Sequence, residues 1–391
     1  MRKKNYYAPY YNEDFFEKLA STDKSEDLIE TWAKHPTPEN TNNVSVAKYT
    51  PQSNLEVPRT DLNDPPVEIS DAHNHLDGYN PDVLLNMMDK AGIGKIMNLS
   101  GLRQKPELLE EQKRLNSVMG DRLMTAAPLP WREVSKKGAV NKFCRWLEEY
   151  EENEVVALKI YKKLGLVIRD EYGNGELLEL TDSRFNPIWE KCSELNFPIF
   201  VHQADPEAFF HKIDKNNERL EELGAHRDWS WYNPEGKLPS RQELLTKLER
   251  VIESNPETIF ISVHVGNNVE NLQKVSRMLD RYPNMWVDIS ARVAGLGRQP
   301  NLARRFFQNH PDRVIFGSDL PPHYEMYARY RRFFETNDDN FKYPTHVSGQ
   351  GNWRVSGINL SDETVKKIYK ENMEKLLSVD HSRLIAKNRR E

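Results

Sequence analysis

Residues 67–100 read VEISDAHNHLDGYNPDVLLNMMDKAGIGKIMNLS, and this stretch decides the fold. Two short β-branched or aliphatic segments, 67–73 and 95–100, flank a segment at 81–92 with apolar residues at three- and four-residue spacing. This order predicts a strand, a helix and a second strand. A strand, helix and strand in that order are typical of the βα units from which parallel sheets are built.

The same unit recurs along the chain. Amphipathic helices are predicted at 105–119, 139–152, 186–196, 241–255 and 268–282. Further strands are predicted at 123–128, 155–161, 198–202, 259–264, 285–290 and 314–319, which brings the number to eight. Eight strand and helix pairs over roughly 250 residues predict an α/β fold of the (β/α)₈, or TIM-barrel, type. A doubly wound open sheet would normally carry a G-x-G-x-x-G turn, and the sequence has none.

Segments outside these repeats differ in composition. The barrel is predicted to span 67–378, with long insertions after the fourth and fifth strands at 171–182 and 204–239. Loops after barrel strands lie at the mouth, where substrate pockets form. Residues 1–66 are interpreted as an N-terminal extension and linker with a helical stretch near 15–32, and residues 379–391 as a basic tail.

Composition excludes several classes of protein. The 391 residues are 38% hydrophobic and carry a net charge of −5, with acidic and basic residues interspersed. No basic field would attract nucleic acid, and no long apolar run would span a membrane. The two cysteines, Cys144 and Cys192, fall in predicted helices, so no disulfide framework is expected. We expect a soluble cytoplasmic protein, or a periplasmic one if a signal peptide has been removed; a homodimer is left open.

The most informative motif is Asp71-Ala72-His73-Asn74-His75, at the end of the first strand. Side chains two residues apart on a strand point to the same face. His73 and His75 can therefore bind one cation through two imidazole nitrogens. An H-x-H pair by itself is weak evidence, because two ordinary histidines produce the same pattern.

Other titratable residues fall at the ends of other predicted strands. His202 ends the fifth strand, His264 the sixth and Asp319 the eighth. The carboxyl ends of barrel strands converge on one mouth, although they are far apart in sequence. Four of the 11 histidines at such positions favour a shared site over four separate core histidines.

These motifs resemble the amidohydrolase superfamily, in particular its amidohydrolase-related branch, which includes decarboxylases and lactonases. The resemblance rests on D-x-H-x-H, PIFVHQ, ISVHVG and G-S-D-x-P, the last at 317–321, and it covers residues 67 to 378. It implies that His73, His75, His202 and Asp319 hold one divalent ion, zinc in many members and manganese or iron in others. It also implies that Asp319 and His264 act as catalytic groups.

Physical chemistry agrees with this ligand set. A cation held by three imidazoles and one carboxylate, with one position open, lowers the pKa of bound water toward neutrality. Asp319 could then orient the water and move its proton, while His264 stabilises the developing oxyanion. The resemblance also implies that His264 acts as an acid or base or polarises a carbonyl.

Lys159 on the fourth strand is open to three interpretations. In some amidohydrolases a lysine on this strand is carboxylated and bridges two metals, which would make the site binuclear. We favour an uncarboxylated Lys159 that binds a substrate carboxylate or oxyanion. The third interpretation is a strand-end lysine that extends to solvent.

Two arginines after the seventh strand indicate an anionic substrate. Arg292 and Arg298 lie in a predicted mouth loop, where guanidinium groups could bind a carboxylate, although surface arginines are an equal alternative. Trp229, Trp231 and Tyr232 in the 204–239 insertion could line the pocket, or could only pack the insertion against the barrel.

We therefore predict an enzyme, a metal-dependent hydrolase that uses metal-activated water on an ester, lactone or amide of a small carboxylated molecule. The alternative is a metal-dependent, non-oxidative decarboxylase of a small carboxylic acid, because the same ligands support both reactions. A non-catalytic binding barrel is the third possibility, and it would be expected to lack one of the strand-end ligands.

Overall fold

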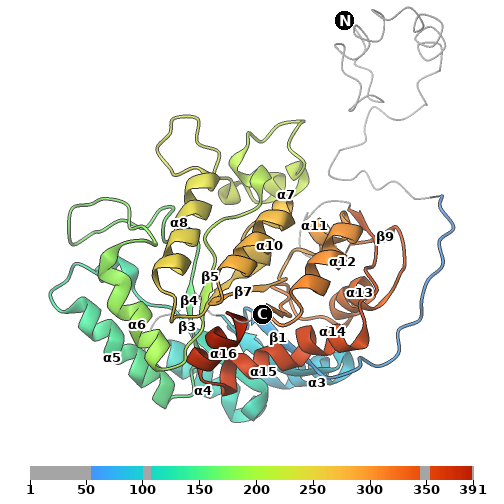
Figure 1. Cartoon of the computed structure of the whole chain (residues 1–391), viewed down its shortest axis with the longest axis horizontal. Coiled ribbons are helices and arrows are strands. Elements are labelled where there is room, and N and C mark those ends of the chain that lie inside the picture. Colours follow the sequence, from blue (N-terminus) through green and yellow to red (C-terminus); the bar gives the residue numbers. More distant parts are fainter. Residues whose placement is uncertain (1–53, 100–106, 344–352, 390–391) are drawn as a thin grey trace, which may run out of the picture.

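The structure is a computed structural model that describes residues 54–99, 107–343 and 353–389. Its centre is a sheet of eight parallel strands, each paired with the next along the chain (Figure 1). All eight predicted strands are present. They are β1 (Ile69–Asn74), β2 (Ile93–Asn98), β3 (Leu123–Ala127), β4 (Ala157–Ile160), β5 (Ile199–Val201), β6 (Phe260–Ser262), β7 (Met285–Asp288) and β8 (Val314–Ile315).

Hydrogen bonds between the β8 segment and β1 bring the two ends of the sheet together. The backbone N–H of Ala72 donates to the carbonyl of Phe316 at 3.0 Å, and that of Asp319 donates to the carbonyl of His73 at 2.7 Å. The predicted (β/α)₈ barrel is therefore confirmed.

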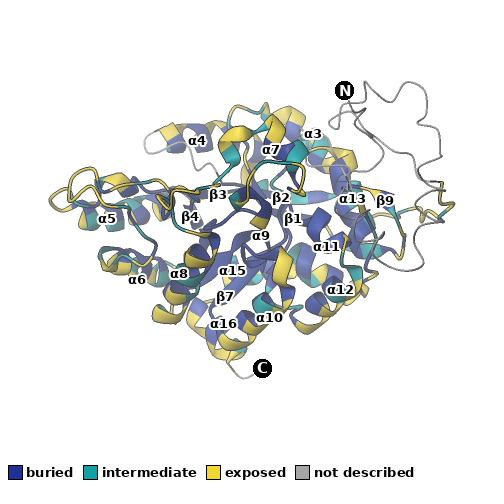
Figure 2. Cartoon of the chain, turned by 90° about the horizontal axis from the view of Figure 1, so that it is seen from above, coloured by how far each residue is buried: buried dark blue, intermediate teal, exposed yellow. Residues whose placement is uncertain are grey.

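Helices follow the strands and surround the barrel, with their exposed faces outward (Figure 2). Each predicted inter-strand helix is found, although residues 105–106 of one prediction lie outside the described residues. A helix between β7 and β8, α12, had not been predicted. The main helices are α3 (Pro81–Ala91), α4 (Glu107–Met119), α5 (Ala139–Glu152), α6 (Asn186–Glu194), α8 (Arg241–Ser254), α10 (Leu272–Arg281), α12 (Pro300–Asn309), α13 (Tyr324–Glu335), α14 (Asp362–Lys366), α15 (Asn372–Ser378) and α16 (His381–Asn388).

Local sequence fixes where these helices begin and end. The side chain of Asn80 accepts hydrogen bonds from the first-turn N–H groups of α3, and Gly92 ends that helix with a φ of 71°, in the left-handed region. Ser240 and Glu243 form a reciprocal capping box at the start of α8. These signals set the boundaries before any tertiary contact is made.

Alternation along the strands separates two cores. Leu158 of β4 packs between the barrel and its helices, whereas Ala157 belongs to the cluster inside the barrel. Lys159 therefore shares the inner face with Ala157, and His202, two residues after the interior Phe200, shares the inner face of its strand. Lys159 and His202 therefore both lie on the inner face of the barrel, near the carboxyl ends of its strands.

The C-terminal segment differs from the predicted basic tail. Residues 381–388 form α16, whose buried Leu384 and Ile385 join the cluster inside the barrel. Asn196 and Pro283, which precede β5 and β7, accept hydrogen bonds from His381 and Asn388. Helix α16 therefore covers the amino end of the barrel, because its apolar face has a core to join.

Residues 54–66 run along the outside of the barrel. Thr60 donates from its backbone N–H and its hydroxyl to the carboxylate of Asp338, and Asn63 accepts a hydrogen bond from Arg331 of α13. The helical stretch predicted near 15–32 lies outside the described residues. Within the described ranges, no helix is both long enough and apolar enough to cross a membrane.

Candidate metal centre

Six titratable side chains, each from a different strand, meet at the carboxyl end of the barrel. The sequence predicted five of these positions, and it missed Asp288. They are His73 near the end of β1, Lys159 in β4, His202 directly after β5, His264 after β6, Asp288 at the end of β7 and Asp319 after β8. His75 follows β1 and stands at the rim of this cluster, with 46% of its side chain exposed.

The carboxylate of Asp319 lies between the histidines. Its Oδ1 is 3.7 Å from His73 Nε2 and 3.4 Å from His75 Nε2, and its Oδ2 is 3.7 Å from His264 Nε2. The donor atoms of His73, His75 and Asp319 all lie within 4.8 Å of one another. His202 adjoins this group through His264, with 3.4 Å between His202 Nδ1 and His264 Nε2.

His73 is held in one orientation by a buried acid. Its Nδ1 lies 2.6 Å from Asp288 Oδ2 and 3.0 Å from the hydroxyl of Ser290. Because a carboxylate only accepts, Nδ1 carries the proton, and the lone pair of Nε2 points to Asp319. Burial and the charge of Lys159 lower the pKa of His73, so the ring is neutral at neutral pH.

His202 is oriented in the opposite sense. Its Nε2 lies 3.2 Å from Asp205 Oδ1, so Nε2 is the protonated nitrogen and Nδ1 faces the cluster. Burial lowers the pKa of His202 to about 4, which keeps the ring neutral. A neutral imidazole with an inward lone pair is the form that binds a metal.

His264 completes the pattern. Its Nδ1 lies 2.9 Å from the backbone carbonyl of Ser290, which can only accept, so Nε2 presents a lone pair to the cluster. Burial holds the pKa of His264 well below its usual value, and the charge of Arg292 lowers it further. The backbone N–H of His264 also donates to Asp288 Oδ1 at 2.6 Å.

The backbone at the mouth is strained. His264, Ala291 and Asp319 follow β6, β7 and β8, and each has a positive φ, at 58°, 50° and 49°. Residues with side chains rarely adopt this region, and such strain gathers at functional sites because surrounding contacts hold it in place.

Asp319 is ionised in this setting. Burial acts to raise the pKa of its carboxyl group, but the neighbouring His73 and His75 outweigh burial and hold the pKa well below its ordinary value. The site thus combines three inward imidazole lone pairs with one carboxylate, and His75 supplies a further imidazole at the rim.

Lys159 is buried beside these groups, and it does not extend to solvent. Its Nζ lies 3.5 Å from His73 Nε2. Burial lowers the pKa of Lys159 to about 8, although the carboxylates of Asp288 and Asp319 act in the opposite direction. The interpretation of Lys159 as a solvent-exposed side chain is therefore wrong.

The two predicted arginines have different surroundings. Arg292 is buried and donates to the carbonyl of Ala291, and no carboxylate among the described residues lies within ion-pair distance of it. Arg298 pairs with Glu218 and stacks on the ring of Trp353 at 4.0 Å. Arg292 is therefore the better placed of the two to bind an anion in the mouth.

The insertion after β5 contributes to the site through one tryptophan. Trp231 Nε1 donates to Asp205 Oδ2 at 2.6 Å, whereas Trp229 stacks on His226 and Tyr232 is exposed. Neither Asp205 nor Asp288 was predicted as a site residue. The signal was present, since Asp205 follows His202 by three residues and Asp288 lies within a predicted strand.

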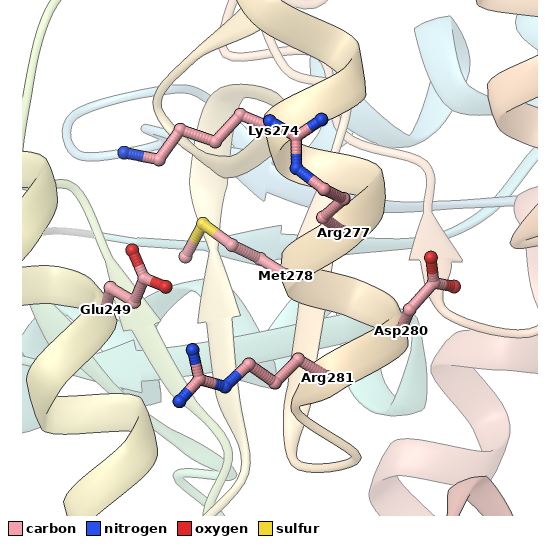
Figure 3. A pocket seen from close by; sticks show the side chains of 6 residues that line it. All are labelled: Glu249, Lys274, Arg277, Met278, Asp280 and Arg281. Carbon is pink, nitrogen blue, oxygen red and sulfur yellow. The ribbon is translucent and has the colours of Figure 1, made fainter.

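A groove on the outer surface lies away from this centre. It has a volume of about 520 Å³ and lies between α8 and α10, on the outside of the barrel (Figure 3). Its lining mixes three cations with two acids and includes none of the strand-end residues. The lining residues are Glu249, Lys274, Arg277, Met278, Asp280 and Arg281.

Fold and donor set together define a (β/α)₈ barrel with a candidate metal centre at the carboxyl ends of its strands. A family model described as amidohydrolase matches residues 138–379, which is more than half of the chain. The chain belongs to the amidohydrolase family and is an enzyme of that family, so the resemblance seen in the motifs is confirmed. The matched range contains His202, His264 and Asp319, whereas His73 and His75 precede it.

Solved structures of other proteins share this fold. The 2,6-dihydroxybenzoate decarboxylase from Rhizobium is 14% identical with a TM-score of 0.50, and the match covers 80% of this chain and 99% of that one. A dihydroxybenzoic acid decarboxylase from Polaromonas sp. JS666, with bound manganese and 2-nitroresorcinol, is 13% identical with a TM-score of 0.49, over 81% and 98% of the two chains. 4-Oxalomesaconate hydratase from Rhodopseudomonas palustris is 15% identical with a TM-score of 0.47, over 82% and 98%.

At 14% identity the likeness to the decarboxylase from Rhizobium shows the fold alone. No curated protein sequence matches the chain.

Proposed function

We propose that the chain is a metal-dependent hydrolase that holds one divalent ion with His73, His75, His202 and Asp319. Its substrate is an ester, lactone or amide of a small carboxylated molecule. The observation that carries this proposal is the inward orientation of the His73 and His202 lone pairs beside the ionised Asp319, whose Oδ1 also lies 3.4 Å from His75 Nε2. Without a cation, so many buried acceptors would face one another with few donors between them.

A bound zinc or manganese ion would polarise a carbonyl and lower the pKa of a water molecule in the open position. Side chains of the protein would then accept the proton of that water molecule. Asp319 is the ionised acceptor beside the cluster, and its carboxylate can orient a water and take up its proton. His264 presents Nε2 as an acceptor, so it can act as a base, and it has no N–H directed at the cluster to stabilise a developing oxyanion.

The anionic part of the substrate would be held by cations. Lys159 is buried at the cluster, and its pKa of about 8 keeps most of it protonated at neutral pH. Arg292 is a buried guanidinium without a carboxylate partner among the described residues. We assign Lys159 and Arg292 to a substrate carboxylate or oxyanion, and Arg298 to an outer position. A second metal bridged by carboxylated Lys159 is the less favoured arrangement.

The second candidate function is non-oxidative decarboxylation of a small carboxylic acid. The same buried cations favour it, because they would bind a substrate carboxylate whether it is retained or lost as carbon dioxide. The two reactions differ in whether water is consumed.

One experiment separates the two. The protein is loaded with zinc or manganese and incubated in ¹⁸O-labelled water with a panel of carboxylated lactones, esters and amides, and separately with 2,6-dihydroxybenzoate. A hydrolase incorporates ¹⁸O into its product without releasing carbon dioxide, and Asp319→Asn abolishes the turnover. Carbon dioxide release without ¹⁸O incorporation would establish the decarboxylase instead.

Metal content gives the independent test. Elemental analysis of the purified protein is expected to show about one zinc, manganese or iron per chain, and His75→Ala and Asp319→Asn should each reduce it. Protein that takes up no divalent metal after chelation and dialysis would support a non-catalytic barrel.

A further inference from the structure

The side chain of Asp205 joins three parts of the molecule. Its carboxylate is buried, with Oδ1 3.2 Å from His202 Nε2. Its Oδ2 accepts from Lys162 Nζ and from Trp231 Nε1, each at 2.6 Å. Burial acts to raise the pKa of Asp205, but Lys162 and His202 outweigh burial and hold the pKa well below its ordinary value. Because Lys162 forms an ion pair with Oδ2 at 2.6 Å, an anion faces the outer nitrogen of His202.

This contact decides which nitrogen of His202 faces the cluster. With Nε2–H directed at a carboxylate, Nδ1 is left with its lone pair toward His264 Nε2, 3.4 Å away. A carboxylate on the outer N–H also makes the imidazole a stronger ligand and fixes its ring plane. Loss of such a partner lowers metal affinity by about 10- to 100-fold in known metal sites.

The same carboxylate anchors the insertion at 204–239. Trp231 donates from its indole to Asp205 and from its backbone to the carbonyl of Phe209, at 2.8 Å, and its ring packs on a small apolar cluster that includes Leu244. Arg241 at the start of α8 donates to the backbone carbonyl of Asp205 at 3.0 Å. The Asp205 carboxylate thus contacts both Trp231 of the insertion and the outer nitrogen of His202.

We propose that Asp205 is a positioning residue for the metal centre, and that Trp231 couples the conformation of the 204–239 insertion to metal binding at His202. This inference rests on the proposed function, since it requires that His202 binds the metal. The insertion is then part of the metal centre's supporting structure as well as a wall of the mouth.

Zinc affinity and tryptophan fluorescence test the inference without any substrate. Three variants are compared with the full-length protein after metal removal. Asp205→Asn keeps the shape of the side chain and removes its charge. Trp231→Phe keeps an aromatic ring and removes the N–H donor. Trp229→Phe is the matched control, because Trp229 lies in the same insertion and stacks on His226 without a hydrogen bond to Asp205.

Competition with a chromophoric chelator should show zinc binding about 10- to 100-fold weaker in Asp205→Asn, a smaller loss in Trp231→Phe and none in Trp229→Phe. Zinc addition should change the tryptophan fluorescence of the parent protein and of Trp229→Phe, but not that of Trp231→Phe. Melting temperatures of the metal-free forms check that each variant folds.

Unchanged zinc affinity in Asp205→Asn would overturn the positioning role, and a zinc-dependent fluorescence change that survives in Trp231→Phe would overturn the coupling. If Asp205→Asn does not fold, the affinity and fluorescence of Trp231→Phe decide the question. Failure of the parent protein to bind zinc or manganese would overturn the proposed function as well. If the parent protein binds the metal and the variants bind it equally well, only the present inference fails.

Discussion

Single residues at the mouth determine which ring nitrogen of each histidine carries the proton and which one faces the cluster. Asp288, Asp205 and the carbonyl of Ser290 each take the outer N–H of one histidine, so three lone pairs point inward. The nearby Asp71 has a different task, because its buried carboxylate accepts from Ser318 and Tyr327 and so ties the β8 segment to β1. A carboxylate at a strand end is therefore a candidate metal ligand, an orienting group or a structural contact between strands, according to what it contacts.

Replacement of Asp288 with Asn should weaken metal binding. The amide can still accept one hydrogen bond, but it removes the negative charge that holds His73 Nδ1–H at 2.6 Å. We expect about a 10- to 100-fold loss of zinc affinity, measured by chelator competition. Asp280→Asn, on the exposed side of α10, serves as the control, and equal affinities in the two variants would contradict the role of Asp288.

Replacement of Arg292 with Gln should impair binding of a carboxylated substrate. A buried hydrogen bond to a charged group contributes about 1.5–3 kcal/mol, which corresponds to roughly a 10- to 100-fold rise in KM or in the inhibition constant of a competing carboxylate. Arg298→Gln should change these constants less, because Arg298 pairs with Glu218 and Trp353. A larger effect of Arg298→Gln would reverse the assignment.

At the scale of elements, the ends of the barrel have separate tasks. The carboxyl ends of the strands carry the titratable residues, and the amino ends are covered by α16 through Leu384 and Ile385. The insertion after β5 is tied to the mouth through Trp231, and residues 54–66 are tied to the outside through Asp338. The contacts of α16 that stabilise the fold and the titratable residues thus lie at opposite ends of the sheet.

The substitution Ile385→Ala in α16 should destabilise the fold and spare the site. Ile385 is 1% exposed, and truncation of a buried isoleucine to alanine lowers the free energy of unfolding by about 2–5 kcal/mol. Arg383→Ala, on the exposed side of the same helix, should change it by less than about 0.5 kcal/mol. Chemical denaturation measures both, and a negligible effect of Ile385→Ala would show that α16 is not docked.

For the whole molecule, the candidate metal centre joins residues of the first and the last strands of the barrel. His73 and Asp288 are 215 residues apart, and Asp319 N–H bonds to the carbonyl of His73 where β8 meets β1. A ligand that binds only the folded state stabilises that state, so a metal at this junction should stabilise the closed barrel.

Removal of the metal should therefore lower the melting temperature. At a free zinc concentration of 100 times Kd, binding contributes about 2.7 kcal/mol, which corresponds to a shift of roughly 4 °C for a barrel of this size. Calorimetry before and after chelation measures the shift, which Asp319→Asn should largely remove. The same shift in Asp319→Asn would place the metal elsewhere.

Sequence by itself determined the order of strands and helices and the positions of the titratable residues at the strand ends. Both are local properties, since apolar periodicity and capping residues act within a few positions of each other. Only the tertiary structure decided that Asp288 and Asp205 orient His73 and His202, that Arg298 turns to Glu218, and that residues 381–388 form a docked helix. These outcomes depend on contacts between segments that meet only when the barrel closes, and no local pattern specifies which side chains then lie within hydrogen-bond distance.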